Sequence, residues 1–269
     1  MAKFDISQFK VAESPYYEEQ FNEIDLYKVA YDSRLPVMIK GPTGCGKSRF
    51  VEYMAYKLDK PIITVSCNED ITASDLIGRF LLDSDGTRWI DGPLTIAARH
   101  GAICYLDEVV EARQDTMVVI HSLTDHRREL MIDKKGELLK AHPDFQLVIS
   151  YNPGYQSLMK DLKQSTKQRF VALDFDFASP EIEAIIVSNE SGVDSEIAEK
   201  LVQFANTTRK LVGHGLDEGA STRLLNYAGI LISKGVDVKD ACQMALIKPI
   251  TDDTEVREAM NASIEAIFG

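Results

Sequence analysis

The clearest chemistry in this sequence lies in a glycine-rich segment that matches the phosphate-binding pattern GxxxxGK[ST] at every fixed position. Its residues are Gly41, Pro42, Thr43, Gly44, Cys45, Gly46, Lys47 and Ser48. Glycines allow the backbone to curl so that successive N–H groups face anionic oxygens at the start of a helix. Lys47 would reach the β- and γ-phosphates of a nucleotide, and the Ser48 hydroxyl would ligate Mg²⁺. The pattern therefore predicts a nucleoside triphosphate site.

Two acids follow an apolar run further along the chain. Asp107 and Glu108 come directly after residues 102–106, whose sequence is AICYL. An acid at the end of such a strand can hold Mg²⁺ through its water shell, which is the role we expect of Asp107. Glu108 can polarise an attacking water as a general base. Because a small-molecule kinase must exclude water, Glu108 favours hydrolysis, and the lack of an NKxD segment favours ATP over GTP.

Three further polar residues could contact phosphate. Asn152 follows the apolar run 146–151, where its amide can bind the γ-phosphate or the attacking water, although Asn-Pro-Gly is also strong turn chemistry. Arg169 lies at the start of the run 170–173, and Arg223 begins a helical stretch. A planar, permanently charged guanidinium can stabilise a transferring phosphoryl group, but a lone arginine is usually a solvated surface residue.

The hydrophobic pattern predicts an α/β domain. Short apolar runs typical of parallel strands covered on both faces alternate with amphipathic helical stretches. The expected strands are residues 37–40, 62–66, 102–106, 146–150 and 170–173. Two segments interrupt the alternation, each with apolar ends around a polar turn, and each predicts an inserted β-hairpin. They are residues 80–90, with Asp85-Gly86 at the turn, and residues 129–140.

After residue 176 the β-rich runs end and helical patterns take over. The expected helices are residues 180–190, 194–211, 221–233, 237–247 and 253–267. We therefore expect three parts: a lead-in of residues 1–30, a nucleotide-binding domain of residues 31–177, and a small all-helical lid domain of residues 178–269.

Composition limits the classes of function open to the chain. Its 269 residues include 30 Lys+Arg and 42 Asp+Glu, a net charge of −12. Nucleic acids and anionic lipids are themselves acidic, so we do not expect binding to either. No apolar run approaches the ~18 residues of a spanning helix, and no signal-peptide core follows the first residue. We therefore expect a cytoplasmic protein without membrane insertion, and its four scattered cysteines predict neither a disulfide framework nor a zinc site.

Together these motifs resemble the AAA+ ATPases and, within them, the MoxR group, over nearly the whole chain. Longer matches are similar to the CbbQ/NorQ/NirQ subgroup. They are GPTGCGKSRFVEYMA (41–55), DGTRWIDGPLT (85–95), RHGAICYLDEVVEAR (99–113), LTDHRREL (123–130) and DFQLVISYNPGYQS (144–157). The resemblance implies an AAA+ phosphate-loop NTPase domain, a parallel sheet between helices with two inserted β-hairpins, followed by a small all-helical lid. It also implies a homo-hexameric ring with ATP and Mg²⁺ at each subunit interface.

The resemblance also assigns roles by position. Residues 41–48 correspond to the Walker A loop, and Asp107 with Glu108 to the Walker B acids. Asn152 corresponds to the polar sensor that follows the next strand, and Arg223 to the second sensor in the lid.

An arginine finger and two moving hairpins complete the resemblance. Arg169 corresponds to the finger that reaches the γ-phosphate of a neighbouring subunit, with Arg209 left open as an alternative. The segments 76–92 and 129–140 correspond to the helix-2 insert and the pre-sensor hairpin, which project from one ring face and move on hydrolysis.

The subgroup implies two possible clients. CbbQ-like proteins act with a von Willebrand factor A-domain adaptor (CbbO-like) to release tight-binding sugar phosphates from inhibited Rubisco, and this Rubisco activase role is the one we expect. NorQ/NirQ-like relatives activate or mature nitric oxide reductase, which is the alternative. The catalytic set weighs against a nucleotide-gated scaffold. The net charge weighs against a DNA motor, although Arg127-Arg128 and residues 133–136 form basic clusters.

Overall fold

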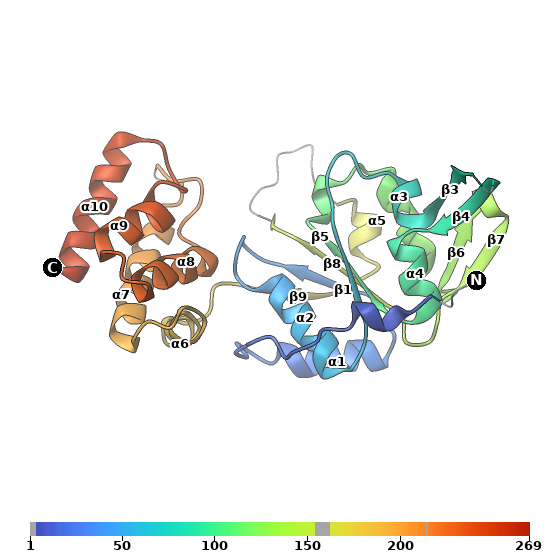
Figure 1. Cartoon of the computed structure of the whole chain (residues 1–269), viewed down its shortest axis with the longest axis horizontal. Helices are drawn as coiled ribbons and strands as arrows, with labels where there is room; N and C mark the ends of the chain where they lie inside the picture. Colours follow the sequence, from blue (N-terminus) through green and yellow to red (C-terminus); the bar gives the residue numbers. More distant parts are fainter. Residues whose placement is uncertain (1–3, 85, 154–161, 214) are drawn as a thin grey trace. The chain divides into compact units, whose positions relative to one another are not determined.

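The computed structural model describes residues 4–84, 86–153, 162–213 and 215–269, and these divide into two compact units (Figure 1). The N-terminal unit contains Phe21–Gly41 and Lys47–Phe175. The C-terminal unit contains Asp176–Gly269, together with the short segments Tyr16–Gln20 and Pro42–Gly46. Each unit has its own hydrophobic core, so each is described by itself.

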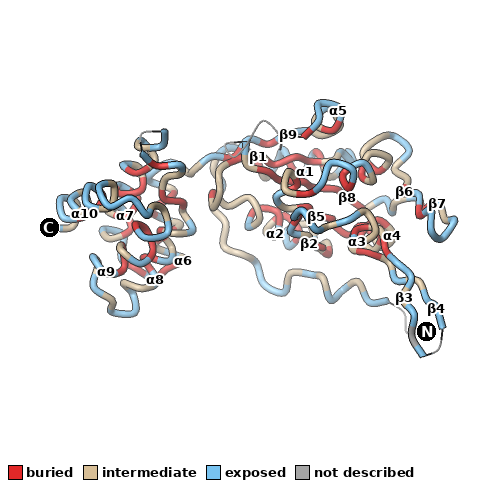
Figure 2. The backbone as a smooth tube through the Cα atoms, turned by 90° about the horizontal axis from the view of Figure 1, so that it is seen from above, coloured by how far each residue is buried: buried red, intermediate tan, exposed pale blue. Residues whose placement is uncertain are grey.

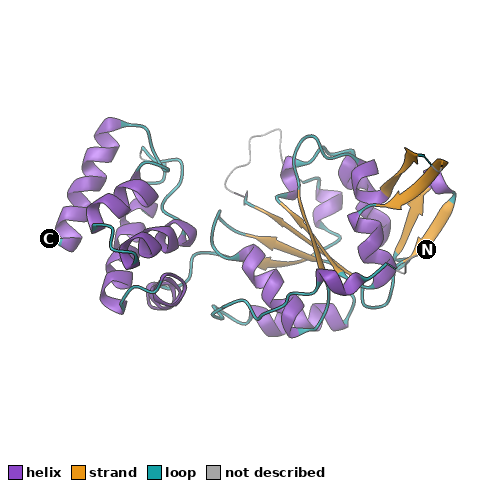
Figure 3. Ribbon diagram, in the orientation of Figure 1, coloured by secondary structure: helices purple, strands orange, loops and turns teal. Residues whose placement is uncertain are grey.

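A parallel sheet of five strands forms the centre of the N-terminal unit (Figure 3). Its strands are β1 (Val37–Lys40), β2 (Ile62–Ser66), β5 (Ile103–Asp107), β8 (Gln146–Tyr151) and β9 (Val171–Asp174). Their order in the sheet is β2-β5-β8-β1-β9, and every neighbouring pair is parallel. The five strands expected from the apolar runs are thus confirmed, each within one residue at either end.

Helices cover both faces of this sheet. They are α1 (Glu23–Asp32), α2 (Lys47–Lys57), α3 (Ala73–Ile77), α4 (Pro93–His100) and α5 (Gln164–Lys167), with the 3₁₀ segments η1 (Ile6–Phe9), η2 (Val109–Glu111), η3 (Thr116–Leu123) and η4 (Asp133–Lys135). On one face Leu94 of α4 and Ile120 of η3 share a buried core with Leu106 and Ile149 of the strands. On the other, the buried rings of Tyr27 and Phe50 lie 5.4 Å apart and join α1 to α2. The three central strands β1, β5 and β8 are accordingly almost entirely buried (Figure 2).

Two antiparallel hairpins are inserted into this unit, as the sequence predicts. The first pairs β3 (Gly78–Asp83) with β4 (Gly86–Asp91), and of its expected turn residues Asp85 lies outside the described residues. The second pairs β6 (Glu129–Ile132) with β7 (Glu137–Lys140). Arg99 of α4 joins the two: its Nε donates to Asp91 Oδ2 over 2.9 Å, and its Nη1 donates to Glu137 Oε1 over 2.6 Å.

The C-terminal unit is built from helices. They are α6 (Pro180–Ser191), α7 (Ser195–Arg209), α8 (Thr222–Ser233), α9 (Val238–Cys242), the π-helical turn η6 (Gln243–Ile247) and α10 (Thr254–Phe268). Serine or aspartate caps the start of α6, α7, α8, α9 and α10 by accepting a backbone N–H, which is why the sequence marks these starts clearly. The expected helices are confirmed, with 237–247 divided into α9 and η6. Among the described helices of both units, none has the length and apolar character needed to cross a membrane.

Candidate nucleotide-binding site

The sheet order brings three of the predicted segments to one edge. β5, β8 and β1 are neighbours, and their carboxyl ends lead into Asp107-Glu108, Asn152 and Gly41 respectively. Because parallel strands end on the same side, these polar residues gather at the carboxyl edge of the sheet, where α/β proteins bind ligands. Asn152 follows β8 and is therefore placed between the acids and the phosphate loop, while Gly154 of its Asn-Pro-Gly turn lies outside the described residues.

The phosphate loop leaves β1 at Gly41 and enters α2 at Lys47. A Cβ on Gly41 would lie 2.6 Å from the carbonyl oxygen of Phe175, so only glycine fits this close backbone approach. Gly46 has a φ of +100°, a conformation that side chains with a Cβ rarely adopt. Lys47 folds back over the loop, and its Nζ donates to the Gly41 carbonyl over 2.8 Å. The loop thus leads directly into the N-terminus of α2, and a helix N-terminus suits an anionic ligand.

The predicted metal residues meet across the start of α2. Ser48 Oγ donates to Asp107 Oδ2 over 3.1 Å. Carboxylate and hydroxyl oxygens are the donors that Mg²⁺ prefers, so this pair fits the metal ion implied by the phosphate loop. The structure therefore brings together the two residues that sequence spacing assigned to the metal.

Two buried hydroxyl groups that the sequence analysis missed also bind Asp107. Tyr105 Oη donates to Asp107 Oδ1 over 2.7 Å, and Ser150 Oγ donates to the same oxygen. Both residues are fully buried, and their hydroxyl oxygens lie 3.0 Å apart. Burial raises the pKa of Tyr105, and the charge of Asp107 adds to the shift, so the phenol stays protonated as a donor.

The proximity of Tyr105 and Ser150 to Asp107 follows from the alternation of side chains along β5 and from the register of β5 against β8. Tyr105 stands two residues before Asp107 on β5 and therefore shares its face of the sheet. The register pairs Leu106 with Ile149, which places Ser150 beside Asp107 on the neighbouring strand. Ser150, a polar residue directly after the apolar residues 147–149, was thus the feature of the sequence that could have indicated this contact.

Glu108 departs from the strand immediately after Asp107. Its backbone has a φ of +53° and a ψ of +45°, a left-handed conformation that costs about 1–2 kcal/mol for a residue with a side chain. Its amide donates to Ser150 Oγ over 3.3 Å, which helps to hold the turn. The strained turn ends β5 and separates the two adjacent acids: Asp107 lies in the hydroxyl network, while Glu108 is exposed.

Cys67 lies beside the acids and takes no part as a nucleophile. Its amide donates to the Asp107 carbonyl over 2.8 Å. Burial raises the pKa of its thiol to about 12, with the charges of Asp107 and Glu108 adding to the shift. The thiol therefore stays protonated at neutral pH.

Arg169 lies at the opposite edge of the sheet. It precedes β9, which is parallel to β1 and pairs Val171 with Val37, so it lies near the amino ends of the strands. The length of β9 alone places the amino and carboxyl edges of the sheet about 10 Å apart. The guanidinium donates to the His121 carbonyl over 3.2 Å, while its buried Nε has no partner among the described residues. Burial lowers the pKa of His121, and the charge of Arg169 lowers it further. The topology thus places Arg169 at the end of the sheet opposite to Gly41 and Asp107.

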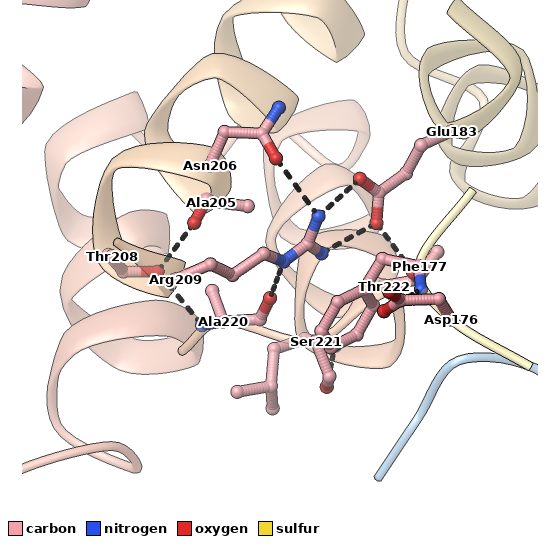
Figure 4. Close-up of polar contacts among 11 residues, drawn as sticks. Asp176, Phe177, Glu183, Ala205, Asn206, Thr208, Arg209, Ala220, Ser221 and Thr222 are labelled. Carbon is pink, nitrogen blue, oxygen red and sulfur yellow. Dashed lines mark hydrogen bonds and ion pairs between the residues drawn. The ribbon is translucent and has the colours of Figure 1, made fainter. Parts of the chain in front are cut away.

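The two remaining arginines belong to the C-terminal unit. Arg223 is exposed in the first turn of α8, next to the cap residue Ser221. Arg209 ends α7 and is instead bound within the unit by both oxygens of Glu183 (Figure 4). Its side chain is only 13% exposed, so the open alternative that Arg209 is an arginine finger is disfavoured relative to Arg169.

Comparison with known families agrees with this geometry. Residues 36–170 match the AAA domain of the dynein-related subfamily, and residues 183–267 match the CbbQ/NirQ/NorQ C-terminal domain. Protein CbbQ of Hydrogenophilus thermoluteolus is 67% identical over 97% of this chain and 98% of its own length. The chain belongs to the CbbQ/NirQ/NorQ family of AAA ATPases. It is accordingly an ATPase, and the family resemblance inferred from the motifs is confirmed.

Other members of the CbbQ/NirQ/NorQ family are also close in length. The denitrification regulatory protein NirQ of Pseudomonas aeruginosa is 55% identical over 89% of this chain and 92% of its own length. Protein NorQ of Paracoccus denitrificans is 52% identical over 96% of this chain and 95% of its own. Among solved structures, the RuvB Holliday junction branch migration motor of Thermotoga maritima has a TM-score of 0.54 at 15% identity, covering 92% of this chain and 76% of that one. At this identity it supports the AAA+ fold alone.

Proposed function

We propose that this chain is an ATP-driven remodelling motor that acts on inhibited Rubisco and releases its tight-binding sugar phosphates. In this proposal it works in the cytoplasm as a homo-hexamer with a von Willebrand factor A-domain adaptor of the CbbO-like kind. The observation that carries the choice of client is the 67% identity to a protein named CbbQ, against 55% for NirQ and 52% for NorQ.

Nucleotide binding would begin at the phosphate loop. The N–H groups at the start of α2 would receive the phosphate oxygens, and Lys47 would exchange the Gly41 carbonyl for the β- and γ-phosphates. Ser48 and Asp107 would hold Mg²⁺, which neutralises charge on those phosphates when it is bound. Tyr105 and Ser150 would keep the Asp107 carboxylate aimed at the metal position.

Hydrolysis would then need one activated water. Glu108 would take a proton from that water as its oxygen bonds to the γ-phosphorus, and the bond to the β-phosphate oxygen would break with its electrons left on ADP. Asn152, at the end of the adjacent strand, would orient the water or the γ-phosphate. The separation of Asp107 from Glu108 by the left-handed turn supports this division of labour, because one acid serves the metal and the other stays open to water.

The position of Arg169 supports assembly into a ring. Arg169 precedes β9 at the amino edge of the sheet, so in this proposal a second copy of the chain would supply the guanidinium at each γ-phosphate. Arg223 would sense the nucleotide from the helical lid. A trans arginine would also couple hydrolysis in one subunit to its neighbour, as a remodelling motor requires.

The experiment is reactivation of Rubisco inhibited by a tight-binding sugar phosphate. The full chain, its genomic-neighbour adaptor and ATP are added, and carboxylase activity is followed, with Glu108→Gln as the matched variant that keeps the nucleotide site. We expect recovery with the wild type and none with the variant. A competent ATPase that restores no carboxylase activity contradicts the Rubisco assignment.

Similarity to NirQ and NorQ favours a second candidate, the activation of nitric oxide reductase. The ATPase residues are the same for both clients, so a parallel test must change the client alone. Co-expression of nitric oxide reductase subunits with and without this chain, followed by nitric oxide consumption, would move the assignment if only that enzyme responded.

A further inference from the structure

A buried ion pair lies inside the C-terminal unit (Figure 4). Glu183, in the first turn of α6, is 0% exposed, and Arg209 ends α7. The pair is bidentate: Arg209 Nη1 donates to Glu183 Oε2 and Nη2 donates to Oε1, each over 2.7 Å. A buried charge is costly unless it is paired, so each residue depends on the other for its place in the core.

The rest of the Arg209 guanidinium contacts the backbone just before α8. Its Nε donates to the Ala220 carbonyl over 2.9 Å, and its Cζ lies 3.7 Å from the centroid of the Phe177 ring. A lysine could carry the charge, but its three donors sit on one nitrogen and could not reach both carboxylate oxygens in parallel together with the Ala220 carbonyl. All three nitrogens of the Arg209 guanidinium therefore donate hydrogen bonds here.

The neighbours of the pair hold the same stretch of chain. Thr208 Oγ1 accepts the Ala220 amide over 2.9 Å. A Cβ on Gly219 would lie 2.6 Å from the Arg209 Cα, so the backbone passes directly against the end of α7. Thr222 Oγ1 donates to Glu183 Oε1 over 2.5 Å, which ties the first residue of α8 to the ion pair.

The next residue is Arg223. Residues 219–222 are thus fixed by the pair and by Thr208, and Arg223 leaves the clamped segment on the exposed side of α8. We propose that Glu183, Arg209 and Thr222 form a positioning clamp that fixes the start of α8 and thereby sets Arg223 for contact with the nucleotide. This inference rests on the nucleotide-sensing role proposed for Arg223.

Thr222→Val is the sharpest test, because it cuts the tie between the ion pair and α8 without removing either charge. The matched control is Thr207→Val, an exposed threonine of α7 whose hydroxyl donates only within its own helix, to the Gln203 carbonyl. The readout is the affinity of the full-length protein for methylanthraniloyl-ADP, measured by fluorescence, together with the thermal midpoint. We expect Thr222→Val to weaken binding about five-fold, the effect of one net hydrogen bond, while Thr207→Val binds as wild type.

A second pair of measurements separates this clamp from the role of Arg223. In an Arg223→Ala background the clamp has nothing to position, so Thr222→Val should then change affinity no further. Arg209→Lys keeps a positive charge beside Glu183 but loses the hydrogen bond to the Ala220 carbonyl. It should also weaken nucleotide binding, but only when Arg223 is present. Unchanged affinity in Thr222→Val, or the same loss with and without Arg223, overturns the clamp while leaving Arg223 as a sensor. If Arg223→Ala itself binds nucleotide as wild type, the proposed sensor fails first, and the clamp falls with it.

Discussion

The phenol of Tyr105 and the carboxylate of Asp107 lie 2.7 Å apart in the interior of the N-terminal unit, on the same face of one strand. Asp107 is also bound by Ser150 and, across the start of α2, by Ser48. The Asp107 carboxylate, which we propose holds the metal ion, is therefore held in one orientation by three hydroxyl groups. Such preorganisation matters because a metal ion binds less tightly to a carboxylate that must first be brought into the right orientation.

Tyr105→Phe removes one donor to Asp107 and leaves the packing of the ring unchanged. We expect roughly a ten-fold rise in the Mg²⁺ concentration needed for half-maximal ATP hydrolysis, because outer partners of metal ligands contribute effects of about this size. A Mg²⁺ titration of ATPase activity, with nucleotide binding followed in parallel, measures it. Tyr56→Phe, on an exposed tyrosine of α2, is the control. The same Mg²⁺ dependence in both variants contradicts a positioning role for Tyr105.

Arg99 joins the two inserted hairpins through Asp91 and Glu137, and all three side chains are less than one-third exposed. Arg99→Met removes one charged donor from each of two partly buried carboxylates, which keep Trp89 Nε1 at Asp91 and Lys135 at Glu137. We expect it to lower the free energy of unfolding by about 2 kcal/mol. Arg79→Met removes an exposed pair with Asp75 and should cost no more than about 0.5 kcal/mol. Urea denaturation of both variants is the comparison, and equal losses would show that the hairpins are held by packing alone.

The ion pair between Arg99 and Glu137 also predicts that the stability of the fold depends on pH. The hydrogen bond from Arg99, followed by that from Lys135, lowers the pKa of Glu137 to about 2. A carboxyl group whose pKa is lower in the folded state stabilises the fold above its ordinary pKa, near 4.5, and loses that contribution as the pH falls towards 2. The stability difference between wild type and Glu137→Gln should therefore shrink from pH 6 to pH 3. A difference that grows on acidification contradicts the assigned partner.

Buried thiols predict the opposite behaviour at high pH. Burial raises the pKa of Cys67 and of Cys242 to about 12, from an ordinary value of 9. The unfolded chain therefore releases these protons first, and their contribution to stability is lost as the pH rises from 9 to 12. At pH 8 iodoacetamide should leave Cys67 and Cys242 unmodified in the native protein and alkylate both in guanidinium, as read by mass spectrometry. Rapid native modification of Cys67 would mean that it is neither buried nor protonated.

Much of the fold could be predicted because the relevant signals are local. The strands ending at Lys40 and Tyr151 are mostly apolar runs, and the capping residue Ser221 precedes α8. Helix α3 was not predicted, since its five residues are too few to show a helical period, and the apolar 3₁₀ segment Thr116–Leu123 has no period of its own.

The site divides along the same line between local and non-local signals. The phosphate loop and Asp107 could be predicted because their chemistry lies in consecutive residues. Tyr105 could not, since its role depends on the register of β5 against β8. The resemblance favoured Arg169 over Arg209 as the finger but left Arg209 open, because its bond to Glu183, 26 residues away, could not be read from the sequence.

The most direct test of the composite ATPase site is a mixing experiment with two inactive variants. In the proposed mechanism Glu108→Gln lacks the base in its own site, and Arg169→Ala lacks the finger for its neighbour. If Glu108 acts in cis and Arg169 in trans, a site is complete wherever an Arg169→Ala subunit is served by a Glu108→Gln neighbour. An equimolar, randomly assembled mixture should then hydrolyse ATP at about one quarter of the wild-type rate, although each variant alone is inactive. A mixture as inactive as its components would contradict the account, because both residues would then have to act within one subunit.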